Sequence, residues 1–464
     1  MRGIFQRVLS GVFHRPPPGT PVPADFRQAV PRGSPAATGR APAQATTAAA
    51  APMAALARRP LIDRGGEIVG FEFRVGEELQ ARLGAQSTSA AQSAHATALL
   101  SSAQWVAKGR RVGLARVPAD WLLRLPALDL GAGTMVALEH SPQAQPDHAE
   151  LEKVVNQLRT QGVKVGWETV FGLALAPDFV LLRQGDDPMA ALLEAAKTWP
   201  AVRQGAAIVA TDIAGVPELE LALQGGVALA CGALTAASLN TPRVPSRSVP
   251  PELRRIGHLL QQLMAGVDTS VIVGDIKGDV GLSVRLLCRI HSARYSQLKA
   301  CSSIEQAVLM LGRNELYRWL SLLLVQFAGT RPSASALQEI TLWRSRLLEL
   351  LASHSREPSP HQLFTLGLAS MLGPLLGLDM AEVVDILKLP DAARQALIDQ
   401  SGPWHRYLRM AELLQTQTLD GPDELSDSFG GPDQVLALSA QAWEWAADNA
   451  NHDTAAQPAG ALNS

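Results

Sequence analysis

Histidine and cysteine side chains are the residues of this chain best suited to hold a metal or to move a proton. The three cysteines are odd in number and contain no C-x-x-C pair: Cys231, Cys288 and Cys301. Four histidines of the second half show no ligand spacing relative to one another: His258, His354, His361 and His405. The adjacent pair His452–Asp453 lies in a polar stretch. These patterns predict no disulfide framework, no structural zinc site and no resident metal or other cofactor.

Composition places the chain among cytoplasmic globular proteins. Its 464 residues suffice for two or three domains, and 47% of them are hydrophobic. A formal net charge of −2 excludes broad nucleic-acid binding by charge, so no nucleic-acid partner is expected. No apolar run reaches the roughly 18–20 residues of a membrane span, and Arg7 interrupts any signal-peptide core.

The first 57 residues are expected to form a disordered tail. Residues 1–15 can form a short amphipathic helix, for which two roles stay open. One is a docking or membrane-surface peptide. The other, which we favour, is a frayed terminus, because so short a helix is marginal alone. Residues 16–57 are rich in Pro, Ala, Gly and Thr and indicate a disordered tether.

Short apolar strands alternate with helices over residues 58–239, which predicts a mostly parallel sheet closed into a barrel of about eight strands. The expected strands are 67–75, 111–117, 135–140, 163–167, 179–182, 206–210 and 226–230. The expected helices are 90–106, 148–161, 188–198 and 217–224. A proline-punctuated linker follows at 240–250.

Residues 251–445 are predicted to be almost entirely helical, and residues 446–464 a flexible tail. Leu282, Leu286, Leu287 and Ile290 form the stripe of a buried amphipathic helix within residues 278–293. Ser302, three residues before Glu305, has the spacing of a capping box. The helix that it begins is expected to bury Ile304, Ala307, Val308 and Leu311 and to close at Gly312.

The amino-acid sequence of residues 278–293, 302–307 and 311–312 resembles that of the HDOD domain, a bacterial signalling module related to HD-type phosphohydrolases. The matching positions include Asp279, His291, Ser292 and Gly312. His291 stands where the family usually has asparagine; a structural role at a helix end is favoured over a proton-sensitive one. Ser370 and Met371 replace the metal-binding His-Asp pair of the hydrolases. The resemblance therefore implies an HDOD domain without metal chemistry.

The first folded region resembles the EAL domain, a cyclic-di-GMP phosphodiesterase built on a barrel, from Pro60–Asp63 through Gly70–Glu72. The vestigial metal-site positions implied by this resemblance are Glu72, Glu139, Glu168 and Asp178. The family's asparagine position falls on Arg116, and its lysine on about Leu181. Too many ligands are replaced for the family's two-metal hydrolysis, so a degenerate EAL barrel and a pseudoenzyme are expected.

Period-two alternation places Gly70, Glu72 and Arg74 on one face of a strand. Glu72 and Glu139 would then point into the barrel mouth, where a buried carboxylate needs a cation. Two interpretations of Arg116 stay open. Its guanidinium replaces the metals as counter-ion to Glu72, Glu139 or both, or it points to solvent beside exposed glutamates. Arg74, Arg116 and Arg183 are also candidates for pairing with phosphates.

The order of the two regions resembles bacterial signal-transduction proteins that join an EAL domain to an HDOD domain. The expected fold is multidomain, α/β plus all-α: a degenerate EAL-type (β/α)8-like barrel and an all-helical HDOD domain. The expected function is non-catalytic signalling, with the barrel as a sensing or docking module and the HDOD domain as a platform for other signalling proteins. The alternatives are a cyclic-di-GMP receptor without hydrolysis and a residual metal-dependent phosphodiesterase. Homodimerisation stays open.

Overall fold

The computed structural model describes residues 58–454, except 76–88, 126–128, 141–145, 169–172, 184–190, 193, 196–198, 204, 214, 233, 235–250, 291–302, 327–331, 377–378, 388 and 417–423. The predicted N-terminal tail and the linker at 240–250 lie outside the described residues. By internal contacts the chain forms two compact units. Unit 1 is Met1–Leu239 with Glu412–Ala437, and unit 2 is Asn240–Ala411 with Leu438–Ser464.

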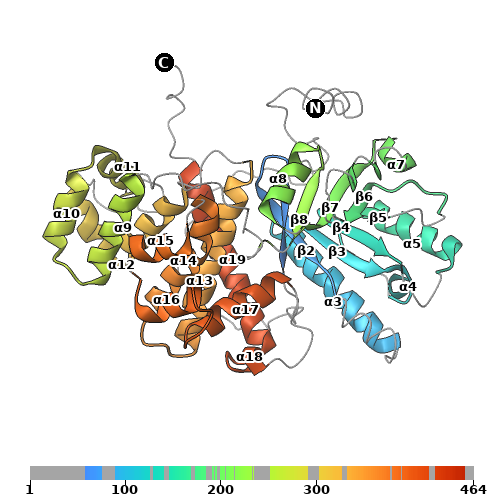
Figure 1. Ribbon diagram of the computed structural model, residues 1–464. Coiled ribbons are helices and arrows are strands. Elements are labelled where there is room, and N and C mark those ends of the chain that lie inside the picture. Colours follow the sequence, from blue (N-terminus) through green and yellow to red (C-terminus); the bar gives the residue numbers. More distant parts are fainter. Residues whose placement is uncertain are drawn as a thin grey trace, which may run out of the picture. The chain divides into compact units, whose positions relative to one another are not determined.

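Eight strands of unit 1 close into a barrel in chain order (Figure 1). They are β1 (Arg59–Asp63), β2 (Ile68–Phe73), β3 (Val112–Pro118), β4 (Thr134–Glu139), β5 (Lys164–Trp167), β6 (Phe179–Arg183), β7 (Ala207–Ile213) and β8 (Leu229–Gly232). Strands β2 to β8 pair in parallel, whereas β1 is antiparallel to both β2 and β8. The predicted barrel is confirmed, and the seven expected strands are all present; β1 completes the ring.

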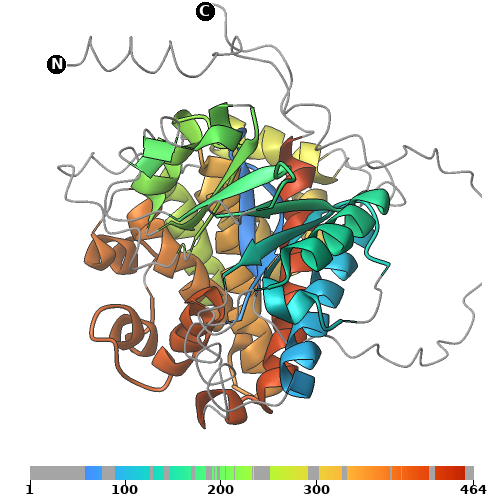
Figure 2. The same cartoon turned by 90° about the vertical axis from the view of Figure 1, so that its right-hand side faces the viewer.

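Helices follow most of the strands and cover them from outside. They are α3 (Ser89–Lys108), α4 (Ala119–Leu122), α5 (His148–Thr160), α7 (Pro200–Arg203) and α8 (Val216–Gln224). Helix α3 packs on β2, β3 and β4, and α5 packs on β5; both face the viewer in Figure 2. The carboxylate of Asp147 caps α5 by accepting hydrogen bonds from the next helical N–H groups. The helix expected at 188–198 falls largely on residues that are not described.

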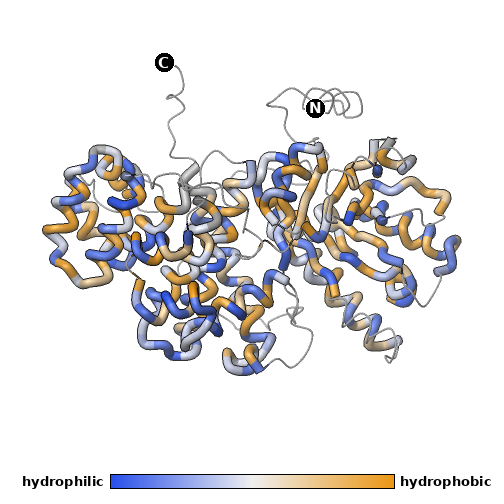
Figure 3. The backbone as a smooth tube through the Cα atoms, in the orientation of Figure 1, coloured by the Kyte–Doolittle hydropathy of each residue, from blue (hydrophilic) through white to orange (hydrophobic). Residues whose placement is uncertain are grey.

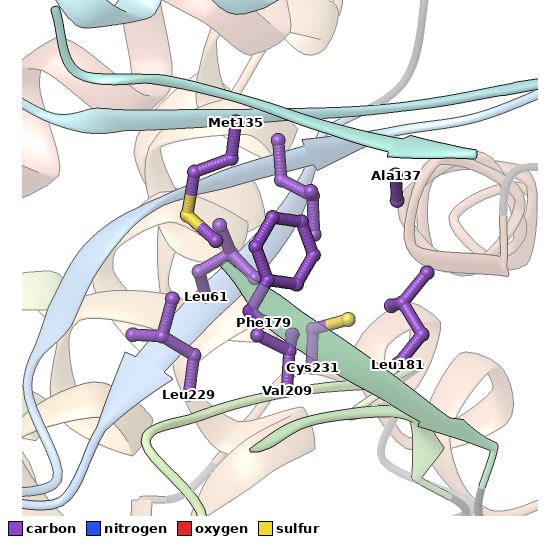
Figure 4. Packing of buried hydrophobic residues seen from close by; sticks show 9 residues of the cluster. Leu61, Met135, Ala137, Phe179, Leu181, Val209, Leu229 and Cys231 are labelled. Carbon is purple, nitrogen blue, oxygen red and sulfur yellow. The ribbon is translucent and has the colours of Figure 1, made fainter. Parts of the chain in front are cut away.

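The barrel interior is filled by apolar side chains at alternating strand positions (Figure 4). This cluster consists of Leu61, Leu114, Met135, Ala137, Phe179, Leu181, Val209, Leu229 and Cys231. The period of two continues upward from it. Two residues further toward one end of the barrel lie Arg59, Arg116, Glu139 and Arg183, one on each of four strands. A charged layer therefore lies directly above the apolar one, at the carboxyl ends of the parallel strands.

Glycine lets neighbouring strands approach closely at two inward-facing positions. A Cβ added at Gly70 of β2 would lie 1.9 Å from the carbonyl oxygen of Val112. A Cβ at Gly166 of β5 would lie 2.2 Å from the carbonyl oxygen of Phe179. Neither distance is compatible with a side chain, so these glycines are required by strand packing.

Unit 2 is helical, as expected. Its helices are α9 (Pro251–Met264), α10 (Thr269–Lys277), α11 (Val280–Ile290), α12 (Ile304–Gln326), α13 (Ala334–His354), α14 (Pro360–Leu376), α15 (Met380–Leu387), α16 (Asp391–Leu397) and most of α17 (His405–Thr416) and of α19 (Pro432–Thr454). Hydrophobic and hydrophilic residues alternate along them (Figure 3). Helices α13 and α14 pack along each other and contribute many of the buried residues of this unit. Trp343 stacks on Trp443 with ring centroids 4.8 Å apart.

The predicted helix pair of unit 2 is present with one shift. Helix α12 begins at Ile304, and Ser303 Oγ accepts a hydrogen bond from the Gln306 N–H, at 3.2 Å. Ser302, the expected capping residue, lies outside the described residues. Gly312 does not end α12 but interrupts it, with φ 72° and ψ 166°. The expected buried positions Ile304, Ala307, Val308 and Leu311 are each less than 9% exposed.

Two expectations about the C-terminal region need correction. Helix α19 runs over Pro432–Thr454, so residues 446–454 are helical where a flexible tail was predicted, and Ala446 is fully buried. The remainder of the predicted tail, 455–464, lies outside the described residues. Residues Glu412–Ala437, which include α18 (Glu424–Asp427), belong to unit 1 rather than to the helical unit. The buried Gln415 side chain donates to the Leu234 carbonyl there, at 3.0 Å. Among the described residues, no helix has both the length and the apolar character to cross a bilayer.

Candidate functional site

Charged side chains from five strands converge at one end of the barrel. Glu72, Arg116 and Glu139 come from neighbouring parallel strands β2, β3 and β4, near or at their carboxyl ends. Because β1 runs antiparallel, its first residue reaches the same end, and Arg59 is the registered partner of Glu72. Asp212 of β7 completes the set. We call Arg59, Glu72, Arg116, Glu139 and Asp212 the mouth cluster.

Arg116 lies at the centre of the mouth cluster and contacts all three of its acids. Its Nη2 lies 2.5 Å and its Nε 2.8 Å from Glu139 Oε1, which is a bidentate approach to one oxygen. Its Nη1 lies 3.3 Å from Glu72 Oε1 and 3.3 Å from Asp212 Oδ2. The Arg116 side chain is 2% exposed and that of Glu72 is fully buried. The structure thus brings Arg116 to both glutamates, and also to an aspartate that the sequence did not single out.

Asp212 reaches the cluster through an irregularity in its strand. The β7–β8 register shifts between Ala210 and Ile213, and Asp212 has φ 58°. A bulge re-aims side chains, and aspartate tolerates the left-handed conformation better than most residues. The carboxylate contacts Arg59 at 3.0 Å and Arg74 at 2.6 Å, both through Oδ1, in addition to Arg116. Sequence alternation alone cannot find it, because the bulge breaks the period of two.

Arg59 is the second residue of the mouth cluster, after Asp212, that sequence analysis missed. It is 2% exposed and its Nη1 lies 3.1 Å from Glu72 Oε2. Its Nε has no hydrogen-bond partner within the described chain. The signal that could have found it is the antiparallel first strand, which brings the start of β1 beside the end of β2.

The electrostatic fields of these charged groups shift one another's pKa values. Burial alone would raise the pKa of Glu72, but Arg59, Arg116 and Arg74 outweigh it and hold that pKa below its usual value. The pKa of Asp212 is held well below its usual range by the same three arginines, again against the effect of burial. Burial would lower the pKa of Arg116, yet Glu72, Glu139 and Asp212 together raise it. Glu72, Asp212 and Arg116 are therefore charged at neutral pH.

Arg183 and Glu168 form the outer rim of this site. Arg183 Nε lies 3.3 Å from Glu168 Oε1, and its Nη2 lies 3.6 Å from Glu139 Oε1. The Arg183 side chain is 45% exposed. Beneath the cluster, burial raises the pKa of the Cys231 thiol, which stays protonated.

Asp178, the fourth expected metal-site position, is not part of the mouth cluster. It precedes β6, whose carboxyl end carries Arg183, so it lies at the opposite end of that strand. Its Oδ2 accepts hydrogen bonds from the Val165 N–H at 2.8 Å and from Arg159 Nε at 3.1 Å. Asp178 joins α5 to β5 and β6 and has a structural role.

The mouth cluster does not fit the two divalent metals of an EAL enzyme. Metal ions need carboxylate oxygens with free lone pairs directed at one point. Here a guanidinium occupies that point, and Glu72, Glu139 and Asp212 are each paired with arginine. Within the described ranges, no group of three or more His, Cys, Asp or Glu residues is arranged to hold a metal.

The HDOD-like positions of unit 2 that are described have structural roles. Asp279 Oδ1 accepts a hydrogen bond from the Leu282 N–H at 3.0 Å at the start of α11, and its Oδ2 pairs with Arg255 at 3.4 Å. Gly312 forms the break in α12. His291 and Ser292 lie outside the described residues. Ser370 and Met371, at the position of the hydrolase His-Asp pair, are 2% and 0% exposed.

Comparison with known proteins assigns the helical region. The HDOD domain family model matches residues 248–395. The chain contains an HDOD domain. YuxH of Bacillus subtilis (strain 168) is 28% identical over 172 residues, which cover 37% of this chain and 42% of YuxH. The cyclic di-GMP phosphodiesterase CdgJ of Vibrio cholerae serotype O1 is 26% identical over 147 residues, which cover 32% of this chain and 34% of CdgJ.

These matches span less than half of either curated relative. Among solved structures, the Bacillus subtilis YkuI protein, with an EAL domain and in complex with c-di-GMP and calcium, aligns at a TM-score of 0.31 and 14% identity. That alignment covers 57% of this chain and 72% of YkuI.

Proposed function

We propose that this chain is a non-catalytic signalling protein in which a degenerate EAL-type barrel is joined to an HDOD domain. The observation that carries the proposal is the position of Arg116. Its guanidinium lies among Glu72, Glu139 and Asp212, where an EAL enzyme would need its metals.

Charge balance supports the substitution of metal by arginine. The mouth and its rim contain four arginines and four carboxylates: Arg59, Arg74, Arg116, Arg183, Glu72, Glu139, Glu168 and Asp212. The formal sum is zero without any bound ion. A divalent cation would meet the buried positive charges of Arg59 and Arg116 and would have to displace short ion pairs. The cluster therefore stabilises the barrel but provides no site for generating a hydroxide.

Arginine also lacks the chemistry that the missing groups would supply. Its guanidinium stays protonated at any physiological pH, so Arg116 cannot act as a general base. The carboxylates of Glu72 and Asp212 are paired with arginines, which hold their pKa values below the usual range, the opposite of the raised pKa expected of a general acid. Phosphodiester hydrolysis has no described residue in this mouth to activate water.

The HDOD domain is proposed as the platform for protein partners. Support comes from the family match over residues 248–395 and from the buried Ser370 and Met371. Ser370 Oγ donates to the Gly367 carbonyl of its own helix at 2.6 Å, so it serves α14 rather than a ligand. The domain keeps its helical core while the hydrolase pair is replaced by residues that pack.

A second candidate function is reception of cyclic-di-GMP without hydrolysis. The specific observation in its favour is Arg183, which is 45% exposed at the rim of the mouth and can present N–H groups to a phosphate. The similarity to CdgJ, a cyclic di-GMP phosphodiesterase, is compatible with this function. Arg59 and Arg116 are buried and committed to the cluster, so a bound nucleotide would meet Arg183 and Arg74 first.

One experiment tests both functions. The full-length chain is titrated calorimetrically with cyclic-di-GMP, with and without Mg²⁺ or Mn²⁺, and the mixture is then separated chromatographically for linear product. We expect no product with either metal. Saturable binding without product, weakened by Arg183→Gln, supports the receptor; no binding supports a protein-interaction scaffold. Metal-dependent product that disappears in Glu72→Gln contradicts the proposal.

A further inference from the structure

A cavity of about 300 Å³ lies within unit 2, and Arg313, which follows the HDOD-like position Gly312, is part of its lining. It is enclosed by the end of α9, the middle of α12, the end of α13 and the beginning of α14. Neither Ser370 nor Met371 contributes to its lining. The volume is at the lower end of the range for small-molecule sites, which suits a ligand of about one aromatic ring with a polar head group.

The floor of the cavity is apolar and rigid. It is formed by Leu263, Met264, Tyr317 and Phe364. Phe364 is 1% exposed and Tyr317 is 8% exposed. The Tyr317 hydroxyl bonds with Thr365 Oγ1, which fixes the ring. Burial raises the pKa of Tyr317, so its hydroxyl stays protonated. A flat apolar body can pack against this floor.

The wall of the cavity is charged and held in place by ion pairs. Glu349, 4% exposed, accepts from Arg318 Nη2 at 2.8 Å and from Arg346 Nη1 at 2.6 Å, and it lies 3.1 Å from His361 Nδ1. Arg313 bonds the Val267 carbonyl at 2.7 Å and the Leu263 carbonyl at 2.9 Å. Glu349 is thus satisfied, and the arginines are fixed before any ligand arrives.

The electrostatic balance of the cavity favours an anion. Its lining contains two permanent cations, Arg313 and Arg318, against one carboxylate, Glu349. Two helical segments also begin at its edge: α14 at Pro360, and the part of α12 that follows the break at Gly312. Helix N-termini carry a partial positive charge and free N–H groups. The side chains of Asn314, Ser359 and Gln362 form no hydrogen bond within the described chain and remain available.

We propose that this cavity binds a small organic anion, with a carboxylate or phosphate head group against Arg318 and its neighbours and a ring-sized apolar body on the floor. The site would give the HDOD domain a small-molecule input of its own. It is independent of the barrel mouth and of the function proposed for it.

The test uses the full-length chain labelled with ¹³C at its methionine methyl groups, because Met264 lines the cavity while Met135 lies in the barrel core. The probes are phenyl phosphate and phenylacetate, with benzyl alcohol as the neutral analogue and inorganic phosphate as the head group alone. The Met264 signal is assigned with Met264→Leu. We expect one of the two organic anions to shift Met264 saturably, with a Kd of about 1 mM or tighter, and to leave Met135 unchanged. Whichever of the two binds more tightly identifies the head group.

Variants separate a built site from weak surface binding. Arg318→Gln should weaken the anion about tenfold or more, whereas Arg254→Gln, on the exposed side of α9, should leave it unchanged. Asn314→Trp fills the cavity from an exposed helix position and should abolish the shift without touching the core. No saturable Met264 shift with either organic anion overturns the proposal. Equal binding of benzyl alcohol, or an affinity unaltered in both Arg318→Gln and Asn314→Trp, also overturns it.

Discussion

Replacing Arg116 by methionine tests whether the mouth cluster stabilises the barrel as a set of charged groups. Methionine keeps most of the side-chain length but removes the charge beside Glu72, which is fully buried. Breaking a buried ion pair costs about 3–5 kcal/mol, because the remaining charge loses its partner. Glu72 keeps Arg59 at 3.1 Å, and Glu139 and Asp212 are partly exposed. The lower figure, about 3 kcal/mol, is therefore expected.

The pH dependence of this effect has a definite sign. In the wild type, the pKa of Glu72 lies below its usual value, so its stabilising contribution is present above the unfolded pKa and is lost as pH falls through the folded pKa. In the variant, burial is opposed by fewer cations, so the folded pKa rises. Protonation at low pH then removes the unpaired charge. The stability difference between variant and wild type should be largest near pH 7 and shrink as pH falls toward 4.

The loss of stability is measured locally by hydrogen exchange with mass spectrometry, on peptides from β2, β3 and β4. The exchange rates are corrected for the intrinsic rates of the unfolded peptides. A change of 3 kcal/mol corresponds to a loss of protection of about 100-fold. Arg183→Met is the matched control, since that arginine is 45% exposed and its pairs should contribute less than about 1 kcal/mol. If Arg116→Met costs no more than the control, or if its cost does not depend on pH, Glu72 is not held as a buried anion and the reasoning fails.

Three further predictions concern packing and ion pairs elsewhere. Gly70→Ala should destabilise unit 1 by about 3 kcal/mol or more, seen as increased exchange in β2 and β3, because its Cβ would lie 1.9 Å from the Val112 carbonyl oxygen; unchanged exchange would contradict the strand spacing. Glu349→Gln should lower the urea midpoint of unit 2 at pH 7, with a difference that fades as pH falls below about 4.5, since arginines hold the pKa of Glu349 low; a constant difference would contradict this. Trp343→Phe should cost about 1–2 kcal/mol, because the Nε1 hydrogen bond to Ser439 Oγ at 3.2 Å and part of the stack are lost; an unaltered urea midpoint would argue against it.

The barrel could be predicted from sequence because its strands carry a strong local signal. Seven apolar stretches alternate with helical ones, and the structure has a strand at each. The eighth strand, β1, pairs antiparallel with β2 and β8. The pairing of β1 with β8 depends on a strand far along the chain, so the local sequence pattern does not indicate it. Arg59 was missed for this reason.

Alternation placed Gly70, Glu72 and Arg74 on one face of the predicted strand 67–75, because a strand has a strict period of two. It left two interpretations of Arg116 open, and the structure shows the one in which Arg116 contacts Glu72 and Glu139. It could not place Asp212, which reaches the cluster through a bulge and a positive φ. The EAL resemblance grouped Asp178 with the other metal-site positions, although that residue lies at the other end of β6. A resemblance between motifs does not determine which end of a strand a side chain occupies.

In unit 2, helix periodicity located α11 and α12 but not the cavity. The residues that line it come from four helices and are separated by up to about 100 positions, so no local spacing shows that they meet. His361, which had no ligand spacing relative to other histidines, acquires a partner in Glu349 only through the packing of α14 on α13.

The discontinuity of unit 1 in the sequence has a consequence during synthesis. Strand β1 leaves the ribosome first but must wait for β8, and Glu412–Ala437 belong to the same unit. About 200 residues separate the end of β8 from Ala437, which take roughly 10–40 s to translate at 5–20 residues per second. For that time the nascent barrel can close around its arginines while its last segment is still missing, and the Leu234 carbonyl has no Gln415 to bond. The first part of unit 2, Asn240–Ala411, is translated within this interval, and its second part, Leu438–Ser464, follows Ala437. Each unit is therefore completed only after most of the other has been synthesised.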